Sequence, residues 1–175
     1  MIISHAGAKP MNIMTQTLDR EVIDSSAGAN IVDIAETTAA ECLATRVRQL
    51  SRIVTRLYDD AMRPLGITAS QYTLLAQLAS RDGITAVEIG HGLDIEKSTL
   101  SRNLKRLLVL GLIVMDPPAG RRGRGLHLTP KGQGVLKEAY PIWQGAQTRA
   151  RASMGNETRA TLDTLLHTAE KLIAD

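Results

Sequence analysis

The 175-residue sequence has few cysteine, histidine and aromatic residues, the types from which disulfides and many metal and ligand sites are built. Its one cysteine, Cys42, excludes an intramolecular disulfide and fits a reducing compartment. Phenylalanine is absent and aromatic residues make up 2% of the chain, so each large ring is a candidate for a particular task. The histidines are scattered without a second ligand at zinc-like spacing, at positions 5, 91, 127 and 167.

Several motifs are also missing, and their absence narrows the class of function. The sequence has no phosphate-binding loop, no dinucleotide glycine motif and no nucleophile elbow. It has no run approaching the ~20 apolar residues of a membrane span, and it lacks the basic start and apolar core of a secretory signal. We therefore expect a cytoplasmic protein that is not an enzyme, does not enter a membrane, and needs neither a cofactor nor a metal.

Positive charge gathers in one region of the chain. Residues 94–131 hold eight lysines and arginines against three acidic residues, a net charge of +5, whereas the whole chain carries only +3. A basic patch confined to one region is typical of a surface that binds phosphates. The alternative is a solvated charged face without a partner.

Residues 95–111 are predicted to form a helix with one apolar and one cationic face. Apolar residues recur at spacings of three and four, at Ile95, Leu100, Leu104, Leu107, Leu108 and Leu112. We expect Asp94 to cap the start of this helix and Gly111 to end it. The polar face carries Lys97, Ser98, Ser101, Arg102, Lys105 and Arg106.

Such a helix fits the major groove of duplex DNA. Short hydroxyl side chains near its start can approach base edges, and longer cationic ones can reach guanines or phosphates. We assign Ser98, Thr99 and Arg102 to base edges, with an inward-facing Thr99 as the alternative. Phosphate contacts are assigned to Lys97, Lys105 and Arg106.

A cationic hairpin, or wing, is predicted at residues 116–126. Before it, residues 112–115 form an apolar strand that Pro117 and Pro118 cannot continue, and residues 126–128 alternate as the returning strand. Its tip carries Arg121, Arg122 and Arg124 among glycines. An arginine on such a tip suits the narrow minor groove of an A·T-rich tract. A basic loop without a partner is the alternative, but it leaves the cationic helix unexplained.

Helices are predicted on both sides of this unit. Weak periodicity over residues 1–36 predicts a flexible extension, and a single long helix is expected over residues 38–64. Capping boxes that begin at Thr68 and Thr85 predict two short helices, the second of which leads into the cationic helix as a helix-turn-helix.

The chain after the hairpin continues as helix. Thr129 and Pro130 have the pattern of a helix start, and this helix is expected to reach about residue 154, with a last helix after Gly155. The predicted fold class is mainly α with a small β-wing. A winged helix-turn-helix domain at residues 67–130 is flanked by dimerisation helices at 37–66 and 131–175.

Three segments give the sequence a family resemblance: GITASQYTLLAQLA, EIGHGLDIEKSTLSRNLKRLLVLGLI and RRGRGLHLTPKG. In this order they resemble the MarR family of bacterial transcription regulators, over about residues 38–173. One departure concerns the wing, where family members often have an aspartate before the arginines and this chain has Gly120. The resemblance implies that Arg122 or Arg124 enters the minor groove.

The resemblance also implies a homodimer, and the apolar seams of the first and last helices agree with one. A two-fold dimer matches a pseudo-palindromic operator with half-sites about one helical turn apart. The function that follows is a repressor that a small-molecule ligand releases from duplex DNA. Two alternatives remain: a single-cysteine redox regulator of the same fold, or a winged-helix adaptor that binds proteins instead of DNA.

Three residues are candidates for sensing a signal. Cys42 is a candidate redox sensor because Arg46, one helical turn later, favours a thiolate. The alternative is a small residue packed near the dimer seam. Tyr72 and Trp143 are candidates for lining a ligand pocket, and the alternative for both is core packing.

Overall fold

In the computed structural model, residues 30–117 and 123–171 are described. Most of the expected N-terminal extension and the predicted contacts of Arg121 and Arg122 therefore lie outside the described residues. The chain divides by its contacts into two units, residues 1–50 and residues 51–175, and each is taken by itself.

The described part of the first unit is helical from Ile31 onward. Helix α2 (Ile31–Glu41) begins where the Asn30 side chain accepts hydrogen bonds from the amides of Val32 and Asp33, at 2.8 and 3.1 Å. Cys42 is extended, with ψ 106°, and the next helix, α3 (Leu43–Met62), starts directly after it. The predictions of an extension through residue 36 and of one unbroken helix over 38–64 are therefore wrong. Neither glycine nor proline marks the break, so periodicity alone did not reveal it.

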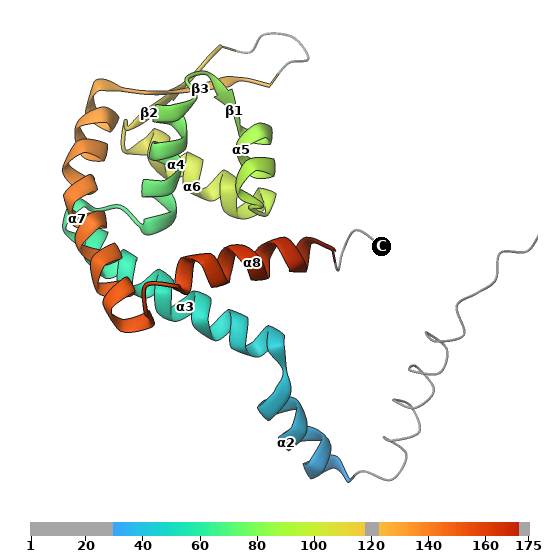
Figure 1. Cartoon of the computed structure of the whole chain (residues 1–175). Helices are drawn as coiled ribbons and strands as arrows, with labels where there is room; N and C mark the ends of the chain where they lie inside the picture. The colour runs from blue at the N-terminus through green and yellow to red at the C-terminus, as the bar shows by residue number, and fades with distance from the viewer. Residues whose placement is uncertain (1–29, 118–122, 172–175) are drawn as a thin grey trace, which may run out of the picture. The chain divides into compact units, whose positions relative to one another are not determined.

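The second unit holds the end of α3 and all later elements. They follow in the order η1 (Arg63–Leu65), α4 (Ala69–Ser80), β1 (Ile84–Thr85), α5 (Ala86–Leu93), α6 (Lys97–Val109), β2 (Ile113–Met115), β3 (Gly125–Leu128), α7 (Pro130–Met154) and α8 (Thr158–Glu170). The predicted class, mainly α with a small β-wing, is confirmed. Figure 1 shows β2 and β3 running away from the helices as a hairpin, with α5 and α6 below its base.

Local capping explains where the helices begin. Both predicted capping boxes are present: the hydroxyls of Thr68 and Thr85 accept from the amides of Gln71 and Glu88, whose side chains accept in return. Thr129 caps α7 with its hydroxyl alone, which accepts from the amide of Gly132 at 3.0 Å, and Pro130 occupies the first turn. These ends are set by residues three positions apart, which is why the sequence predicts them well.

The sheet is antiparallel, in the order β1-β3-β2. Ile84 pairs with Leu126, and Ile113 pairs with Leu128. The sequence analysis missed β1, because a strand of two residues carries no alternation of its own. This strand joins the turn after α4 to the hairpin and so gives the wing a third strand at its base.

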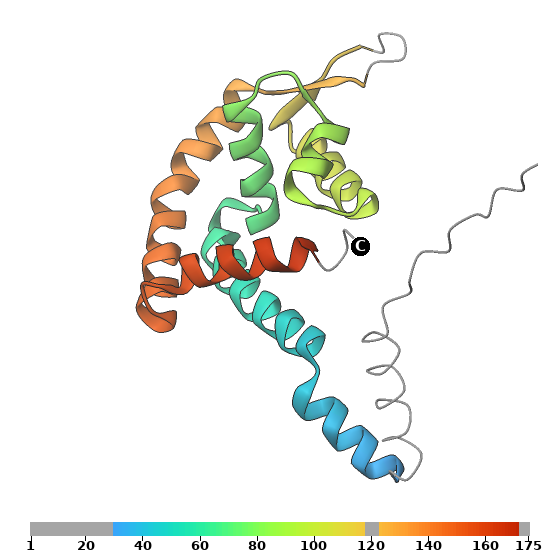
Figure 2. The ribbon, with the colours of Figure 1, turned by 45° about the vertical axis from the view of Figure 1, so that its right-hand side comes forward.

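The core of the second unit lies where α4, α6 and the sheet meet. Leu74, Leu78, Leu107, Ile113 and Leu126 are at most 2% exposed. Each buried leucine contributes about 1.5–3 kcal/mol relative to an exposed one. Figure 2 shows α4 between α7 on one side and the α5–α6 pair on the other. This packing holds α6 in place and leaves its polar face outward.

One close approach explains the Leu-Thr-Pro-Lys-Gly segment after the hairpin. A Cβ built at Gly132 would lie 2.0 Å from the carbonyl oxygen of Leu112, so only glycine lets the start of α7 pass this backbone. The hydroxyl of Thr129 also donates to the carbonyl of Gly111, at 2.7 Å. The start of α7 is thus fastened to the end of α6.

Candidate nucleic-acid interface

The turn between α5 and α6 differs in one residue from the predicted pattern. Asp94 does not cap α6; it ends α5 in the left-handed conformation, with φ 48° and ψ 46°. Aspartate tolerates this conformation better than most residues, because its short polar side chain can bond locally. The amide of Ile95 donates to the carbonyl of Gly90, at 3.1 Å, and closes the turn.

Glu96 is the residue that caps α6. Its carboxylate accepts from the amides of Ser98 and Thr99, at 3.0 and 3.2 Å, and from the Ser98 hydroxyl. These bonds, with that from the Ser98 hydroxyl the strongest, hold the pKa of Glu96 below its ordinary value. The sequence analysis missed Glu96 because aspartate is the commoner cap and stood two residues earlier.

The two faces of α6 are divided as the apolar pattern predicts. Leu100, Leu104 and Leu107 are buried. The opposite face is exposed over about three turns and carries Lys97, Ser98, Ser101, Arg102, Lys105 and Arg106. Four of these six side chains are cationic, so the outer surface of α6 is a positively charged ridge.

All three residues assigned to base edges already form side-chain hydrogen bonds within the protein. Thr99 is half-buried, and its hydroxyl accepts from the Arg102 guanidinium, at 3.2 Å. The Ser98 hydroxyl donates to Glu96. To contact a base edge as donors, Arg102 and Ser98 must exchange these bonds for bonds to DNA.

The charge of Lys131 has a role inside the fold. Its ammonium donates to the carbonyl of Leu110, at 2.8 Å, at the C-terminal end of α6, where the helix dipole favours a cation. Gly111 ends the helix in the left-handed conformation, with φ 68°, as predicted. Part of the local positive charge is therefore engaged in stabilising the end of α6.

The described part of the wing places Arg124 on an exposed position before β3. Its guanidinium Nε donates to the backbone carbonyl of Asp116, at the end of β2. The Asp116 amide in turn donates to the carbonyl of Gly125, at 2.9 Å. Arg124 is thus tied to the opposite strand at the base of the wing.

His127, one of the four scattered histidines, forms a cluster with two aspartates that the sequence did not predict. Its Nδ1 lies 2.8 Å from Oδ1 of Asp82, and its Nε2 lies 3.1 Å from Oδ1 of Asp116. The imidazole is 30% exposed. The hydrogen bonds to Asp82 and to Asp116 raise the pKa of His127 above its ordinary value of 6.5. No local pattern signals a contact between residues 45 positions apart.

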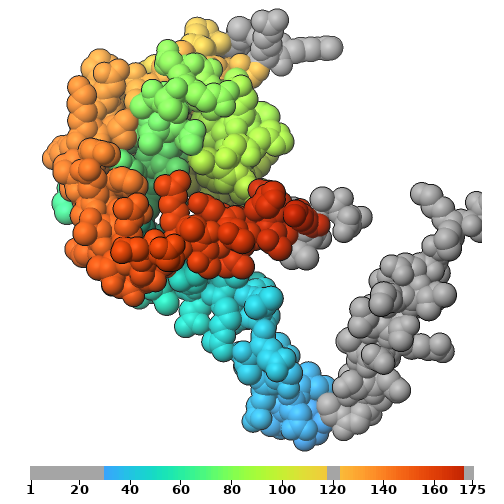
Figure 3. Space-filling model, in the orientation of Figure 1, coloured from blue at the N-terminus to red at the C-terminus, as the bar shows by residue number. Residues whose placement is uncertain are grey.

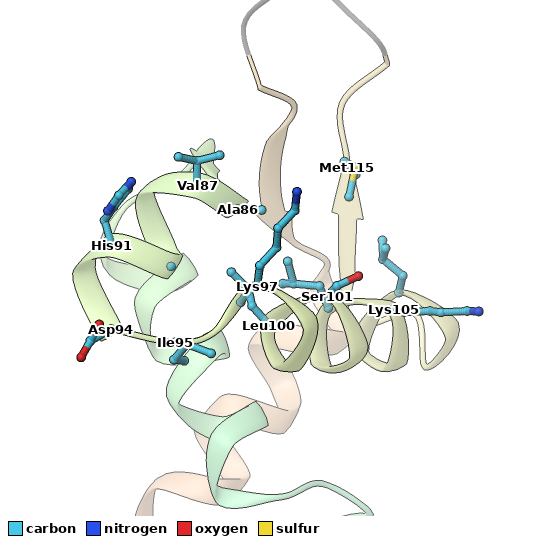
Figure 4. A pocket seen from close by; sticks show the side chains of 13 residues that line it. Ala86, Val87, His91, Asp94, Ile95, Lys97, Leu100, Ser101, Lys105 and Met115 are labelled. Atoms are coloured by element: carbon cyan, nitrogen blue, oxygen red, sulfur yellow. The ribbon is translucent and has the colours of Figure 1, made fainter.

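A hollow of about 700 Å³ lies between α5, α6 and β2. Its floor is mostly apolar, with Val87, Leu104 and Met115 among the lining residues. Figure 4 shows Lys97, Ser101 and Lys105 projecting from successive turns of α6 beside it. The cationic ridge therefore borders a depression whose walls come from three elements.

The predicted pair Tyr72 and Trp143 are brought together. Their ring centroids lie 6.2 Å apart, and Trp143 also stacks on Tyr140, at 6.1 Å. Tyr72 is nearly buried and belongs to the core, as the alternative prediction held. Tyr72 also lines a second hollow of about 580 Å³ between α4 and α7, with Lys137 and Tyr140, whereas Trp143 is not among its lining residues.

Cys42 lies at the break between α2 and α3 and is half-buried. Hydrogen bonding with the Thr45 hydroxyl is the largest cause that lowers the pKa of its thiol. The charge that contributes is that of Arg48, while Arg46 donates to the carbonyl of Ala40, at 3.1 Å. The expected part of Arg46 in favouring a thiolate is therefore wrong.

The outer helices expose apolar side chains. Leu43 and Val47 of α3 are 79% and 65% exposed, and Leu165 and Leu166 of α8 are 59% and 64% exposed. The space-filling view shows α8, in red, as a rod with an open surface (Figure 3). Apolar stripes of this kind indicate surfaces that are covered in an assembly.

Over residues 30–117 and 123–171, no group of three or more histidine, cysteine or acidic side chains is placed to hold a metal ion. Within the same residues, no helix has the length and apolar character to cross a membrane.

Comparisons with known proteins point to one family. The sequence profile of the MarR family matches residues 65–123. The chain is 35% identical over 86 residues to the multiple antibiotic resistance protein MarR of Salmonella typhimurium, which covers 49% of this chain and 60% of that protein. It is 31% identical over 98 residues to the transcriptional regulator HosA of Escherichia coli O111:H-, covering 55% of this chain and 71% of HosA. The match thus spans less than two thirds of the Salmonella protein.

Solved structures extend the similarity over more of the chain. The M. tuberculosis transcriptional regulator MosR is 33% identical, with a TM-score of 0.67 over 75% of this chain and 98% of MosR. A structure of MosR in complex with DNA is 31% identical, with the same TM-score over 76% of this chain and 99% of that chain.

Proposed function

Since the chain belongs to the MarR family of transcription regulators, we propose that it binds duplex DNA, with α6 in the major groove and the wing in the adjacent minor groove. The observation that carries this proposal is the cationic ridge of α6, whose four exposed lysines and arginines stand opposite a buried leucine stripe. The MosR complex with DNA supports it, because that protein shares 31% of its residues with this chain.

Within this interface we assign Ser98, Thr99 and Arg102 to base edges. The phosphate contacts are assigned to Lys97, Lys105 and Arg106, and Ser101 is a DNA contact without an assigned target. In the wing, Arg124 is a candidate for the minor groove, and Arg121 and Arg122 remain predictions from the sequence alone.

The test is binding to a pool of random duplexes at several salt concentrations, followed by selection of the bound sequences. Affinity must fall steeply with salt, because each phosphate contact releases a counterion. Lys105→Ala together with Arg106→Ala must reduce the salt slope by about two, one for each lost contact. Arg149→Ala on α7 removes one exposed charge away from the ridge and is the control. Binding that is absent or insensitive to salt contradicts the proposal and favours the protein-binding adaptor.

We further propose that the protein acts as a homodimer on a pseudo-palindromic operator. The support is the apolar surface of α3 and of α8, since no described residue of α8 is buried. Leu165→Glu together with Leu166→Glu must shift the mass in analytical ultracentrifugation from dimer to monomer. Thr164→Glu, which adds one charge to the same helix at an exposed polar residue, is the control. A wild-type protein that is monomeric at micromolar concentration refutes the dimer.

A repressor of this kind needs a signal, for which we propose a small aromatic acid bound in the hollow between α4 and α7. Tyr72 and Tyr140 supply aromatic walls there, and Lys137 supplies a cation. A ligand releases DNA only if it binds the DNA-free state more tightly. A screen of aromatic carboxylates for release of DNA, repeated with Lys137→Ala, tests the site: an active compound must lose potency in this variant and not in Arg149→Ala. Unchanged potency places the ligand elsewhere.

Redox regulation through Cys42 is the second candidate, and the lowered pKa of its thiol favours it. A thiolate reacts with peroxide faster than a thiol. Release of DNA by peroxide must therefore disappear in Cys42→Ser. Release that persists in this variant excludes the cysteine as the sensor.

A further inference from the structure

We propose that His127 is a positioning residue for DNA binding: its imidazolium, held between Asp82 and Asp116, fastens the wing to the turn that follows α4. This role rests on the proposed DNA binding and adds a dependence of DNA affinity on pH. The wing then meets DNA in a fixed position at low pH and is loosened as the pH rises.

The geometry requires a charged ring for both contacts. Asp82 belongs to the turn between α4 and β1, Asp116 follows β2, and His127 lies on β3 between them. Each carboxylate oxygen is an acceptor, at 2.8 and 3.1 Å from the two ring nitrogens. A neutral imidazole has one N–H and can satisfy only one of them, whereas an imidazolium donates to both.

The backbone around the cluster leaves room for it. A Cβ at position 125 would lie 2.5 Å from Oδ2 of Asp116 and 3.1 Å from the carbonyl oxygen of Gly83. The Gly83 amide donates to the carbonyl of Leu126, at 3.2 Å. Glycine at position 125 thus lets the turn, β3 and the carboxylate of Asp116 approach one another, with His127 two residues along the same strand.

Asp116 connects this cluster to the wing arginine. Its carboxylate faces His127, while its backbone carbonyl accepts from Nε of Arg124. A shift of Asp116 on loss of the imidazolium is therefore passed to Arg124 through a direct hydrogen bond. Arg124 is the described wing residue that we assign to the minor groove.

The net charge of the His127 cluster favours DNA binding at low pH, as its hydrogen-bond geometry does. With a protonated ring the three side chains carry a net charge of −1, and with a neutral ring they carry −2. Among the described residues, the other charged groups near this cluster in the chain are Arg124 and the ion pair of Arg81 with Glu88 on α5, at 3.2 Å. Deprotonation of His127 therefore adds one negative charge close to a surface that must meet phosphates, and water and salt screen part of its effect.

The direction of the pH effect follows from the raised pKa of His127. The paired contacts of the imidazolium with Asp82 and Asp116, called the clamp below, are complete when the pH is below the ordinary pKa of 6.5. They are lost as the pH rises through the higher pKa of His127 in the folded protein. DNA affinity must therefore fall as the pH rises from 6.5 through the raised pKa of His127. A lost exposed charge pair corresponds to a change of about fivefold in the dissociation constant.

The experiment measures affinity for a selected duplex between pH 5.5 and 8.5 at constant ionic strength. Wild type must lose affinity as the pH rises, whereas His127→Gln must bind equally at all these pH values, near the level of wild type at high pH. His167→Gln, a change at an exposed histidine of α8, is the control and must keep the wild-type slope. A wild-type slope in His127→Gln overturns the proposal.

A second variant separates positioning from folding. Asp82 is 80% exposed, so Asp82→Asn is tolerated, and it removes the carboxylate whose hydrogen bond raises the pKa of His127 most. The fall in affinity must move to lower pH in this variant, and the amides of β2 and β3 must exchange with deuterium faster at pH 7.5. If DNA affinity falls at the same pH in Asp82→Asn as in wild type, the clamp is refuted, even if His127→Gln does not fold. Salt-dependent binding that shows no pH effect refutes only the clamp, whereas absent binding at every pH refutes DNA binding itself.

Discussion

Helices α6 and α8 are both 13 residues long and both carry a leucine stripe, yet only α6 buries it. In α6, Leu100, Leu104 and Leu107 are covered by the chain's own core, while Leu165 and Leu166 of α8 are open. An apolar stripe indicates that one face of a helix is buried against another surface. It does not indicate whether that surface belongs to the same chain or to another one. We infer that α6 is completed by its own unit, and that α8 is completed by a second copy.

The largest expected effect comes from breaking the stripe of α6. Leu107→Ala creates a cavity in a fully buried site and must lower the free energy of unfolding by about 2–5 kcal/mol. Leu166→Ala, the matched change in α8, must leave unfolding of the dilute protein nearly unchanged and weaken association instead. Urea unfolding at two protein concentrations measures both. Equal losses at low concentration would show that α8 is packed within its own chain.

The next effect concerns the polar side of α6. Arg102→Ala must weaken binding to the selected duplex by about 1–3 kcal/mol and relax the base preference at one position. Arg159→Ala, on the exposed face of α8, must leave the affinity as it is. Fluorescence anisotropy with single-base variants of the duplex is the measurement. Unchanged affinity for Arg102→Ala removes this residue from base contact.

A smaller effect is expected in the wing. Arg124→Ala must weaken binding more on duplexes with A·T-rich flanks than on G·C-rich ones, because the narrow minor groove attracts an arginine. The same pair of duplexes, measured with Lys105→Ala as the control, gives the comparison. Equal losses on both flanks would restrict Arg124 to phosphate contact.

The smallest effect contrasts the two helix starts, each with a glutamate at the cap. Glu96 accepts two amide bonds, whereas Glu157 makes no side-chain cap bond. Glu96→Ala must therefore lower the thermal midpoint, and Glu157→Ala must not.

The contribution of Glu96 also has a pH dependence. Its pKa is held below the ordinary value of 4.5, so the contribution is present above 4.5 and is lost as the pH falls through the lower folded value. Thermal unfolding between pH 3 and 6 checks this. Identical curves for Glu96→Ala and wild type would mean that the cap does not stabilise α6.

Much of the fold was predictable because its signals are local. The boxes at Thr68 and Thr85 and the Thr129–Pro130 start each depend on residues within one helical turn. The errors also lie at helix ends: Asp94 was predicted to cap α6 and ends α5, and the break at Cys42 was missed. Only three residues separate α5 from α6, so the two helix ends compete for the same polar side chains, and the backbone conformation selects between them.

The candidate site was predictable in composition and not in arrangement. The exposed face of α6 follows from its period, and the charges on it follow directly. Three contacts do not follow from the sequence: the bond of Lys131 at the end of α6, the bond from Arg102 to Thr99, and the cluster of Asp82, His127 and Asp116. The Lys131 and Arg102 bonds depend on the side-chain rotamer and on where α6 ends in the folded protein. The histidine cluster joins three segments that are separate in the sequence.

The amino-acid sequence by itself determined most of the helices, the caps at Thr68, Thr85 and Thr129, the inward leucines of α6 and the cationic character of its outer face. These features depend on spacing along the chain. Only the tertiary structure decided that a two-residue strand closes the base of the wing, and that one histidine meets two aspartates there. Contacts between residues far apart in the chain arise when the core brings their segments together, and no periodicity in the sequence records them.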